Sequence, residues 1–292
     1  VAALVVLSLI WGYTWIVQKD GLRFASPLDY AALRALPGAG LLFAALLVLR
    51  RPLLPSRPGY ALLLGLFQTA GFLGLTNWAL VAGGAGRSAI LCYTMPFWTL
   101  LIARAVLHER LRALQWLAVA CAGAGLLLVL EPWQLAGTLS SKLLAIAGGV
   151  SWAISAVVAK AWRAQEEYDL LSVTAWQMLL GGIVLAVVAW LVPSHPIHWT
   201  PHFGLLLAYI VVLGTAVGWV LWLYILSRLP AGIAGLSMMA VPVLGILFSW
   251  LQLGEQPSGF ELAGIVVIAA SLALLTWAGR RRDTADVDGP AA

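Results

Sequence analysis

Aromatic and polar side chains recur on one face of two hydrophobic stretches, and they are the groups of this sequence best suited to binding. Trp11, Trp15 and Gln18 follow one another at spacings of four and three residues, which places them on one face of a helix. Trp152 and Ser155 form a matching face 141 residues later. Hydroxyl and amide groups are costly in hydrocarbon, so these faces are expected to point into a helix bundle. There they either line a pathway for a solute or pack helices together.

Further residues able to bind a small molecule lie in other hydrophobic stretches. Amides both donate and accept hydrogen bonds, which suits a ligand with a carboxylate and an ammonium group, although they can equally bridge two helices. Aromatic faces also accept cations. We expect a substrate pathway that contains Trp11, Trp15, Gln68, Phe72, Asn77, Tyr93, Trp98, Trp152, Ser155, Trp219, Trp222, Tyr224 and Met238.

Pro96 and Pro242 occupy equivalent places near the middle of two hydrophobic stretches. A proline inside a helix removes a backbone hydrogen bond and frees a carbonyl about one turn earlier. We expect both prolines to act as hinges of a gate. The alternative is that they are static bends, which membrane helices tolerate.

Groups needed for catalysis or for carrying protons are missing from the middle of the hydrophobic stretches. All twelve Asp and Glu residues lie in loops, tails or the first turn of a stretch, and the four histidines lie outside the stretches. Three of these, His195, His198 and His202, are spaced like metal ligands on a helix, but prolines between them argue against a helix. An intramembrane protease would need His or paired Asp at depth, and ATP-driven transport would need a Walker motif. The sequence therefore predicts no enzyme, no metal site, no cofactor, and transport without a buried proton relay.

The composition is that of an integral membrane protein. Hydrophobic residues make up 62% and charged residues 10% of the 292 residues, and the mean hydropathy is +0.95. Stretches of about 20 apolar residues cross a bilayer as helices, since lipid does not tolerate an unpaired backbone. The sequence predicts an all-α fold with ten membrane-spanning helices, at residues 1–18, 30–49, 60–82, 88–107, 113–130, 143–162, 170–192, 203–226, 232–253 and 258–278.

The two halves of the chain repeat each other. Pro96 and Glu109 are thirteen residues apart, and Pro242 and Glu255 repeat this spacing 146 residues later. Five helices in each half would make the second half enter the bilayer from the opposite side, as in secondary transporters with inverted repeats. We expect a first five-helix repeat at residues 1–131, a linker at 132–142, a second repeat at 143–279 and a basic, polar tail at 280–292.

The basic residues predict the orientation in the bilayer. With a cytoplasmic N-terminus, twelve Lys and Arg residues fall in cytoplasmic loops, and four fall on the opposite side, namely Lys19, Arg23, Arg87 and Lys142. Cytoplasmic loops are enriched in Lys and Arg, so both termini are expected in the cytoplasm. The net charge of +5 resides mostly in these loops and does not indicate a nucleic-acid partner.

Three charged residues near the ends of spans are expected to be structural. Arg34 lies near the start of the second span and is expected to snorkel to the surface. Glu109 and Glu255 precede the fifth and tenth spans, where a carboxylate complements the positive end of a helix. Phosphorylated solutes fit poorly because basic residues are missing from the middle of the spans. A neutral or zwitterionic solute is favoured.

The order of several motifs resembles the EamA family of the drug/metabolite transporter superfamily. The similarity covers residues 9–277 and is carried by IWGYTWIVQK at 10–19, Arg34, Pro96, HERL at 108–111, and Gln115 with Gly123. Members of this family are ten-helix permeases, and the tryptophan-rich spans are most similar to the YddG-type bacterial amino-acid exporters. The resemblance implies a bacterial inner-membrane exporter of amino acids or related metabolites, including aromatic ones.

Alternating access around a central cavity fits the repeat better than a channel does. No feature of the sequence requires an oligomer. Two other functions stay open, which are the export of drugs or organic cations and a membrane assembly role without transport.

Overall fold

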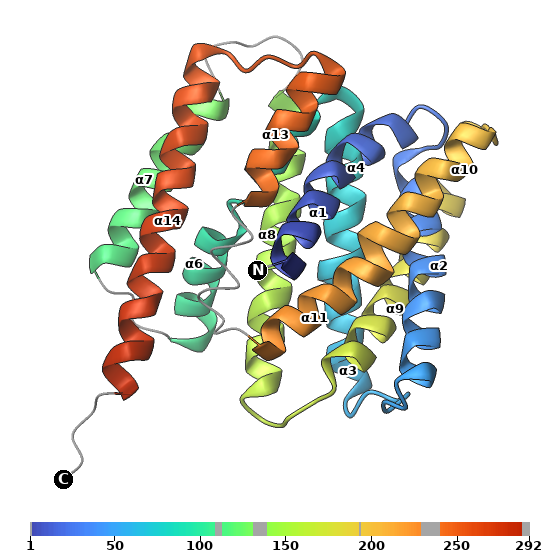
Figure 1. The fold of residues 1–292 in the computed structure, drawn as a ribbon, viewed down its shortest axis with the longest axis horizontal. Helices are drawn as coiled ribbons and strands as arrows, with labels where there is room; N and C mark the ends of the chain where they lie inside the picture. The colour runs from blue at the N-terminus through green and yellow to red at the C-terminus, as the bar shows by residue number, and fades with distance from the viewer. Residues whose placement is uncertain (1, 109–112, 131–138, 193, 229–239, 288–292) are drawn as a thin grey trace.

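A computed structural model of the chain describes residues 2–108, 113–130, 139–192, 194–228 and 240–287. These residues form helices joined by short connections, and none of them belongs to a β-strand (Figure 1). The predicted all-α architecture is therefore confirmed for this part of the chain.

The first half forms helices with the following bounds: α1 (Ala2–Gly21), α2 (Pro27–Val48), α3 (Pro58–Leu64), the π-helical segment η1 (Gly65–Gly71), α4 (Phe72–Ala82), α5 (Ala85–Cys92), α6 (Met95–Leu107) and α7 (Ala113–Leu130). The segments α3, η1 and α4 continue one another as a single helix, Pro58–Ala82.

The second half forms α8 (Leu139–Arg163), α9 (Leu170–Leu191), α10 (Pro201–Ala208), the π-helical segment η2 (Tyr209–Val217), α11 (Gly218–Arg228), α13 (Ala240–Leu253) and α14 (Gly259–Val287). In each half, a π-helical segment therefore follows a short helix: η1 follows α3, and η2 follows α10. Such segments within α-helices are frequent at functional sites.

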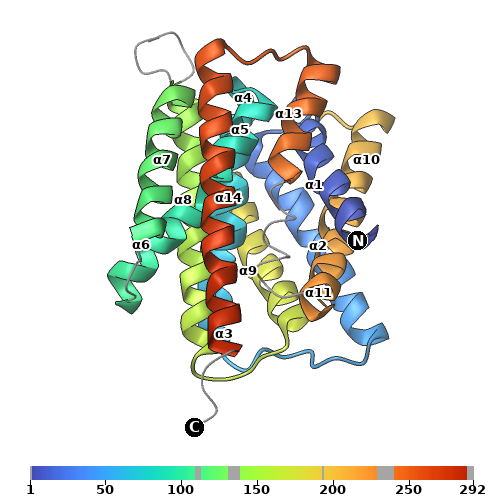
Figure 2. The same ribbon diagram turned by 60° about the vertical axis from the view of Figure 1, so that its left-hand side comes forward.

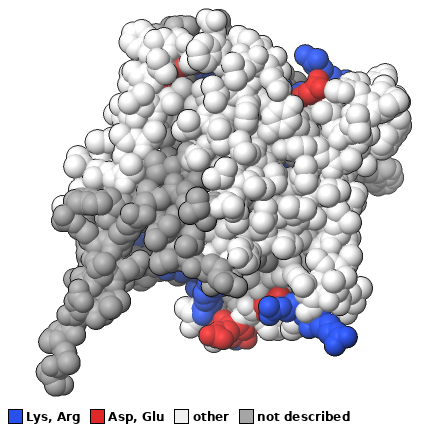
Figure 3. Space-filling model, viewed as in Figure 1, with Lys and Arg blue, Asp and Glu red and all other residues white. Residues whose placement is uncertain are grey.

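The described helices are those of a multi-pass membrane protein. Seven are long and apolar enough to cross a membrane: Ala2–Gly21, Pro27–Val48, Pro58–Ala82, Ala85–Leu107, Leu139–Arg163, Leu170–Leu191 and Pro201–Trp222. Three shorter apolar helices accompany them, at Ala113–Val129, Ala240–Leu253 and Gly259–Ser271. On the face shown in Figure 3, the visible charged side chains gather at the upper and lower ends, with an uncharged belt between them.

Polar residues at the helix starts explain where several helices begin. Ser26 precedes α2, and its hydroxyl accepts a hydrogen bond from the Asp29 N–H. Asp169 accepts from the Ser172 N–H at the start of α9. Such caps pair backbone N–H groups that the first turn of a helix cannot pair itself.

The predicted fourth span is interrupted. Tyr93 and Thr94 form a turn between α5 and α6, and Pro96 is the second residue of α6. A proline in the first turn of a helix costs no helical hydrogen bond, so the break precedes Pro96 and is not a bend at it. Pro242 is the third described residue of α13, and residues 229–239 before this helix lie outside the described ranges. Among the described residues, Pro37 lies inside a helix, α2, and it is not one of the prolines predicted to bend a helix.

The start of α8 differs from the expected boundary. The helix begins at Leu139, four residues before the expected start of the second repeat, because the segment 139–142 continues the helix towards its N-terminus. The expected linker at 132–142 therefore ends in a helical turn. Its other residues, 132–138, lie outside the described residues.

Contacts between the two halves recur with the first-half and second-half helices interchanged. Helix α2 lies along α9, and α7 lies along α14 (Figures 1 and 2). Helix α1 packs against α13, and α8 packs against α6. The segment η2 contacts α2, and η1 contacts α9. The main hydrophobic clusters lie between these pairs.

Glycines permit two of these matching contacts. A Cβ atom at Gly38 of α2 would lie 2.7 Å from the Thr215 Cγ2 atom of η2. A Cβ atom at Gly181 of α9 would lie 2.5 Å from the Thr69 Cβ atom of η1. The glycines are 143 residues apart and the threonines 146, so the same close approach occurs at equivalent places in the two halves.

Candidate functional site

Five aromatic residues from four helices form a cluster in the bundle, called the aromatic cluster below: Trp11 of α1, Phe72 of α4, Trp152 of α8, and Trp219 and Trp222 of α11. The Trp219 ring lies 6.0 Å from that of Trp11 and 6.2 Å from that of Trp152, against which it stacks at 14°. Trp11 also lies 6.2 Å from Trp222, and Phe72 meets Trp152 edge-on at 4.8 Å. Because α1 and α4 belong to the first half and α8 and α11 to the second, the cluster joins the halves.

The backbone of the second half holds Trp11 in this cluster. Trp11 Nε1 donates a hydrogen bond to the Gly214 carbonyl at 3.1 Å, and a Cβ atom at Gly218 would collide with the indole. Trp219 is 8% exposed, whereas the other four cluster residues are half-buried. The rings therefore retain accessible surface on which an apolar or aromatic group can stack, and their faces attract cations.

A buried guanidinium group is linked to the aromatic cluster through η2. Arg34 of α2 is 8% exposed, and its Nη1 donates to Gln18 Oε1 at 2.8 Å while its Nε donates to Thr215 Oγ1 at 3.3 Å. Thr215 follows Gly214, whose carbonyl binds Trp11. The expectation that Arg34 snorkels to the surface is wrong, because its charged end is buried between α1 and η2.

The model of the EamA-like transporter family matches the chain in two stretches, residues 1–131 and 139–277. The chain belongs to this family. The predicted resemblance is thereby confirmed, and the protein is a membrane transporter of the EamA type. These proteins are transporters as a family, in agreement with the prediction that the chain is not an enzyme.

Relatives of this EamA-like chain match nearly its whole length. The "Uncharacterized transporter YoaV" of Bacillus subtilis is 29% identical and covers 94% of this chain and 96% of its own. The "Probable amino-acid metabolite efflux pump" of Salmonella typhimurium is 29% identical and covers 96% of both chains. A solved crystal structure that is 21% identical has a TM-score of 0.67, covers 96% of this chain and 97% of its own, and has the same fold.

Three of the other predicted pathway residues of this EamA-like transporter lie outside the aromatic cluster. Trp15 is 5% exposed and packs against Gly245 of α13, one turn further along α1 than Trp11. Ser155 is buried, and its hydroxyl donates to the Trp152 carbonyl. The buried Asn77 donates from Nδ2 to the Pro27 carbonyl. The contacts described for these three residues are packing contacts and bonds to backbone.

The remaining predicted pathway residues are dispersed. Tyr93 lies in the turn between α5 and α6 and Trp98 in the first turn of α6, where its Nε1 donates to the hydroxyl of the threonine four residues earlier. Gln68 is half-buried in η1. Tyr224 is 51% exposed and lies five residues after Trp219, which places it on another face of α11. Met238 lies outside the described residues.

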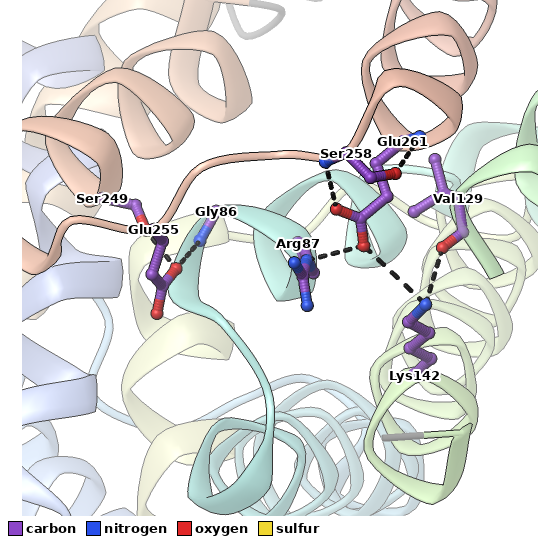
Figure 4. A network of polar contacts seen from close by, with 8 residues as sticks. All are labelled: Gly86, Arg87, Val129, Lys142, Ser249, Glu255, Ser258 and Glu261. Atoms are coloured by element: carbon purple, nitrogen blue, oxygen red, sulfur yellow. Dashed lines mark hydrogen bonds and ion pairs between the residues drawn. The ribbon is translucent and has the colours of Figure 1, made fainter. Parts of the chain in front are cut away.

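Glu261 of α14 is the centre of a buried ionic network at the upper end of the molecule (Figure 4). Its Oε1 lies 2.7 Å from Arg87 Nε and 3.8 Å from Lys142 Nζ, and the side chain is 1% exposed. The Ser258 N–H donates to Glu261 Oε2 at 2.9 Å, and the Glu261 N–H donates to Ser258 Oγ at 3.1 Å. This reciprocal pairing is a capping box. The Ser-x-x-Glu spacing ahead of an apolar run is the sequence signal that predicts it.

Glu255 binds the start of α5 and does not cap α14. It accepts hydrogen bonds from the Gly86 N–H at 3.4 Å and from the Ser249 hydroxyl. The capping role expected for Glu255 therefore belongs to Glu261, and Glu109 lies outside the described residues. Glu255 and Glu261 together tie the second half to α5 of the first half at the upper end (Figure 4).

Ion pairs also join the halves at the lower end, where the loop before α3 meets the loop after α8. Arg57 Nε lies 3.4 Å from Glu166 Oε1, and Arg51 Nη1 lies 3.6 Å from Asp169 Oδ2. Hydrogen bonds, chiefly the one from Trp162 Nε1 at 2.6 Å, hold the pKa of Glu166 below its usual range. The side chains of Arg51 and Arg57 are 60% and 46% exposed, so these pairs hold the halves together more weakly than the upper network does.

Within the described ranges, no group of three His, Cys, Asp or Glu side chains is placed to hold a metal ion. Of the three histidines spaced like ligands, His202 pairs with Asp20 at 2.7 Å. His195 and His198 stack on each other at 6.4 Å.

Proposed function

We propose that the protein exports small neutral or zwitterionic metabolites, including aromatic amino acids, across the bacterial inner membrane. The aromatic cluster carries this proposal, because it offers ring surfaces from both halves at one place. Two relatives support the direction and the location. One is named a probable amino-acid metabolite efflux pump, and the "Uncharacterized inner membrane transporter YedA" of Escherichia coli is 28% identical over 94% of this chain.

The proposed architecture is ten membrane helices in two inverted five-helix repeats. The family model matches each half separately, and the contacts between the halves come in pairs with exchanged roles. The glycine–threonine approaches at Gly38 and Gly181 belong to one such pair. A pseudo-twofold axis between the halves accounts for all three observations, and inverted repeats generate such an axis.

Alternating access then requires contacts at each end that break and form again. The network around Glu261 and the bond from the Gly86 N–H to Glu255 tie the halves together at the upper end. The pair of Arg57 with Glu166 ties them together at the lower end. Rocking of the halves around the aromatic cluster would open one set while the other set holds.

The proposal predicts exchange of aromatic amino acids by the purified protein. Proteoliposomes preloaded with unlabelled L-tryptophan are expected to take up labelled L-tryptophan by counterflow. Trp219→Leu removes the ring that contacts both Trp11 and Trp152. An aromatic contact is worth about 1 kcal/mol, so the loss of one such contact with the solute is expected to lower exchange about fivefold. Trp190→Leu, at an indole that is 84% exposed, is the matched control and should leave exchange unchanged.

The same vesicles separate the remaining alternatives. If no amino acid exchanges but an aromatic organic cation does, the protein is a cation exporter, which the accessible indole faces also fit. If no probe moves at all, the assembly role gains support. Transport is proposed to be uncoupled, so accumulation beyond the imposed solute gradient in vesicles with a pH gradient would contradict that part.

The proposed orientation places both termini and the lower end in the cytoplasm. Green fluorescent protein fused after Arg282 is expected to fluoresce in cells, and alkaline phosphatase fused at the same site is expected to be inactive. The reverse pattern would place the lower end outside. Phosphatase inserted at the exposed His195, which is expected to be active, serves as the control.

A further inference from the structure

Arg34 is a buried cation whose described partners are both neutral. Its Nη1 and Nε donate to the amide oxygen of Gln18 and the hydroxyl of Thr215. In the part of the chain that the structure describes, no carboxylate pairs with it. Arg34 is the eighth residue of α2, about 10 Å along the helix from its start, which is a third of the way through a bilayer core.

Such an arrangement is costly without an anion. A guanidinium group keeps its charge in proteins and carries five N–H donors, of which two are bonded here. Buried charges are normally paired, and ionisable residues at membrane depth mark substrate sites or ion pathways. An anionic group that approached Arg34 would therefore find unused N–H donors and an unpaired positive charge.

A second polar group next to Arg34 also lacks a partner. The hydroxyl of Tyr30 is buried and has no hydrogen-bond partner among the described residues. Tyr30 lies four residues before Arg34, so the two side chains share one face of α2. The hydroxyl of Tyr30 could donate a second hydrogen bond to a carboxylate that is bound by Arg34.

The repeat argues that the scaffold does not need this charge. The position equivalent to Arg34 in the second half, 143 residues later, is Gln177 of α9, which is equally buried. A neutral amide therefore fits the same environment between the second helix of one half and the π-helical segment of the other. The positive charge distinguishes one half from the other, as expected for recognition of one end of a solute.

We propose that Arg34, assisted by Tyr30, binds the carboxylate of the transported solute while the aromatic cluster holds its side chain. The backbone link from Thr215 to Gly214 and Trp11 places the two sites next to each other. The ligand class is then small monocarboxylates with an apolar or aromatic body, amino acids among them. This inference rests on the proposed transport function and replaces the expectation that Arg34 snorkels to the surface.

Counterflow of L-phenylalanine and of L-phenylalaninamide, which lacks the carboxylate, tests the role of Arg34. The wild type is expected to exchange the acid at least tenfold faster than the amide. Arg34→Gln, which copies Gln177, should abolish that preference by slowing the acid while leaving the amide within twofold. Arg34→Lys keeps the charge and should retain part of the preference. Equal loss of both probes would overturn the proposal and leave Arg34 a structural residue.

A binding measurement separates this proposal from the proposed function. If the wild type exchanges no amino acid, the thermal midpoint of the detergent-solubilised protein is compared with phenylacetate and with neutral phenylacetamide. A rise with phenylacetate alone that disappears in Arg34→Gln and shrinks in Tyr30→Phe supports a carboxylate site in a transporter of other solutes. Equal shifts with both probes, or no shift, would overturn the Arg34 site itself.

Discussion

Replacing Glu261 with glutamine is expected to lower the free energy of unfolding by about 3 kcal/mol or more. The substitution leaves the capping box with Ser258 in place, since glutamine serves that role as well as glutamate. It removes the negative charge that faces Arg87 and the buried ammonium group of Lys142. Removing one partner of a buried ion pair typically costs about 3 to 5 kcal/mol, because the remaining charge stays desolvated.

Unfolding of the purified protein in mixed micelles measures this loss. Arg87→Gln is expected to cost less, because Lys142 still faces Glu261 and the Arg87 side chain is 35% exposed. The double variant should be about as stable as Glu261→Gln alone, since both changes remove one shared interaction.

Glu255→Gln is the matched control at the same end of the molecule. It keeps an oxygen that can accept from the Gly86 N–H and the Ser249 hydroxyl, so its cost should stay near 1 kcal/mol. Strict additivity of the Glu261 and Arg87 variants, or equal costs for Glu255→Gln and Glu261→Gln, would show that the upper network does not hold the halves together as an ion pair.

Apolar length and breaker residues were sufficient to predict most of the helices. Helix α9 begins at the predicted residue, because it is a long apolar run that follows a polar segment, and α7 fills the whole described stretch 113–130. The turn at Tyr93 and Thr94 was not predictable in the same way. Neither residue is a strong helix breaker, and the following Pro96 is equally compatible with a bend and with a new helix start.

Local spacing predicted which residues share a helix face but not what each of them contacts. Trp11 and Trp15 lie on one side of α1, yet Trp11 meets α11 while Trp15 packs against α13. Two different helices approach α1 at these two heights, and the spacing of residues in the sequence does not predict which helix contacts which residue. The aromatic cluster needed residues separated by more than 200 positions, such as Trp11 and Trp219, to be brought together by the packing of the halves.

The burial of Arg34 was also not predictable from its local position in the sequence. Its position near a span end allowed the side chain to reach the surface, and the burial is decided by partners 16 and 181 residues away, Gln18 and Thr215. The repeat did contain one usable signal, because Arg34 and Gln177 differ in charge at equivalent positions. A difference of this kind between two copies of one scaffold points to a role that only one copy performs.

Helix α9 and η1 approach each other so closely at Gly181 that an added Cβ atom would collide with backbone, and Gly181→Ala should cost about 3 kcal/mol. The added methyl group would meet the Gly65 carbonyl and lie 2.5 Å from the Thr69 Cβ atom, and neither obstacle can rotate away. Overpacking of this kind typically costs about 1 to 3 kcal/mol, and the upper part of that range applies where backbone must move. The measurement is again unfolding in mixed micelles.

The equivalent Gly38→Ala differs in one respect that makes the comparison decisive. Its new methyl group would meet the Thr215 Cγ2 atom at 2.7 Å, and this atom is removed by Thr215→Ser while the hydroxyl that binds Arg34 is kept. Gly38→Ala with Thr215→Ser should therefore recover most of the loss, whereas Gly181→Ala with Thr69→Ser should not, because the Gly65 carbonyl remains. Gly40→Ala in α2, with open space around it, should be neutral or stabilising by up to about 1 kcal/mol. Rescue of Gly181→Ala by Thr69→Ser would mean that side chains, and not backbone, set the distance between the halves at this contact.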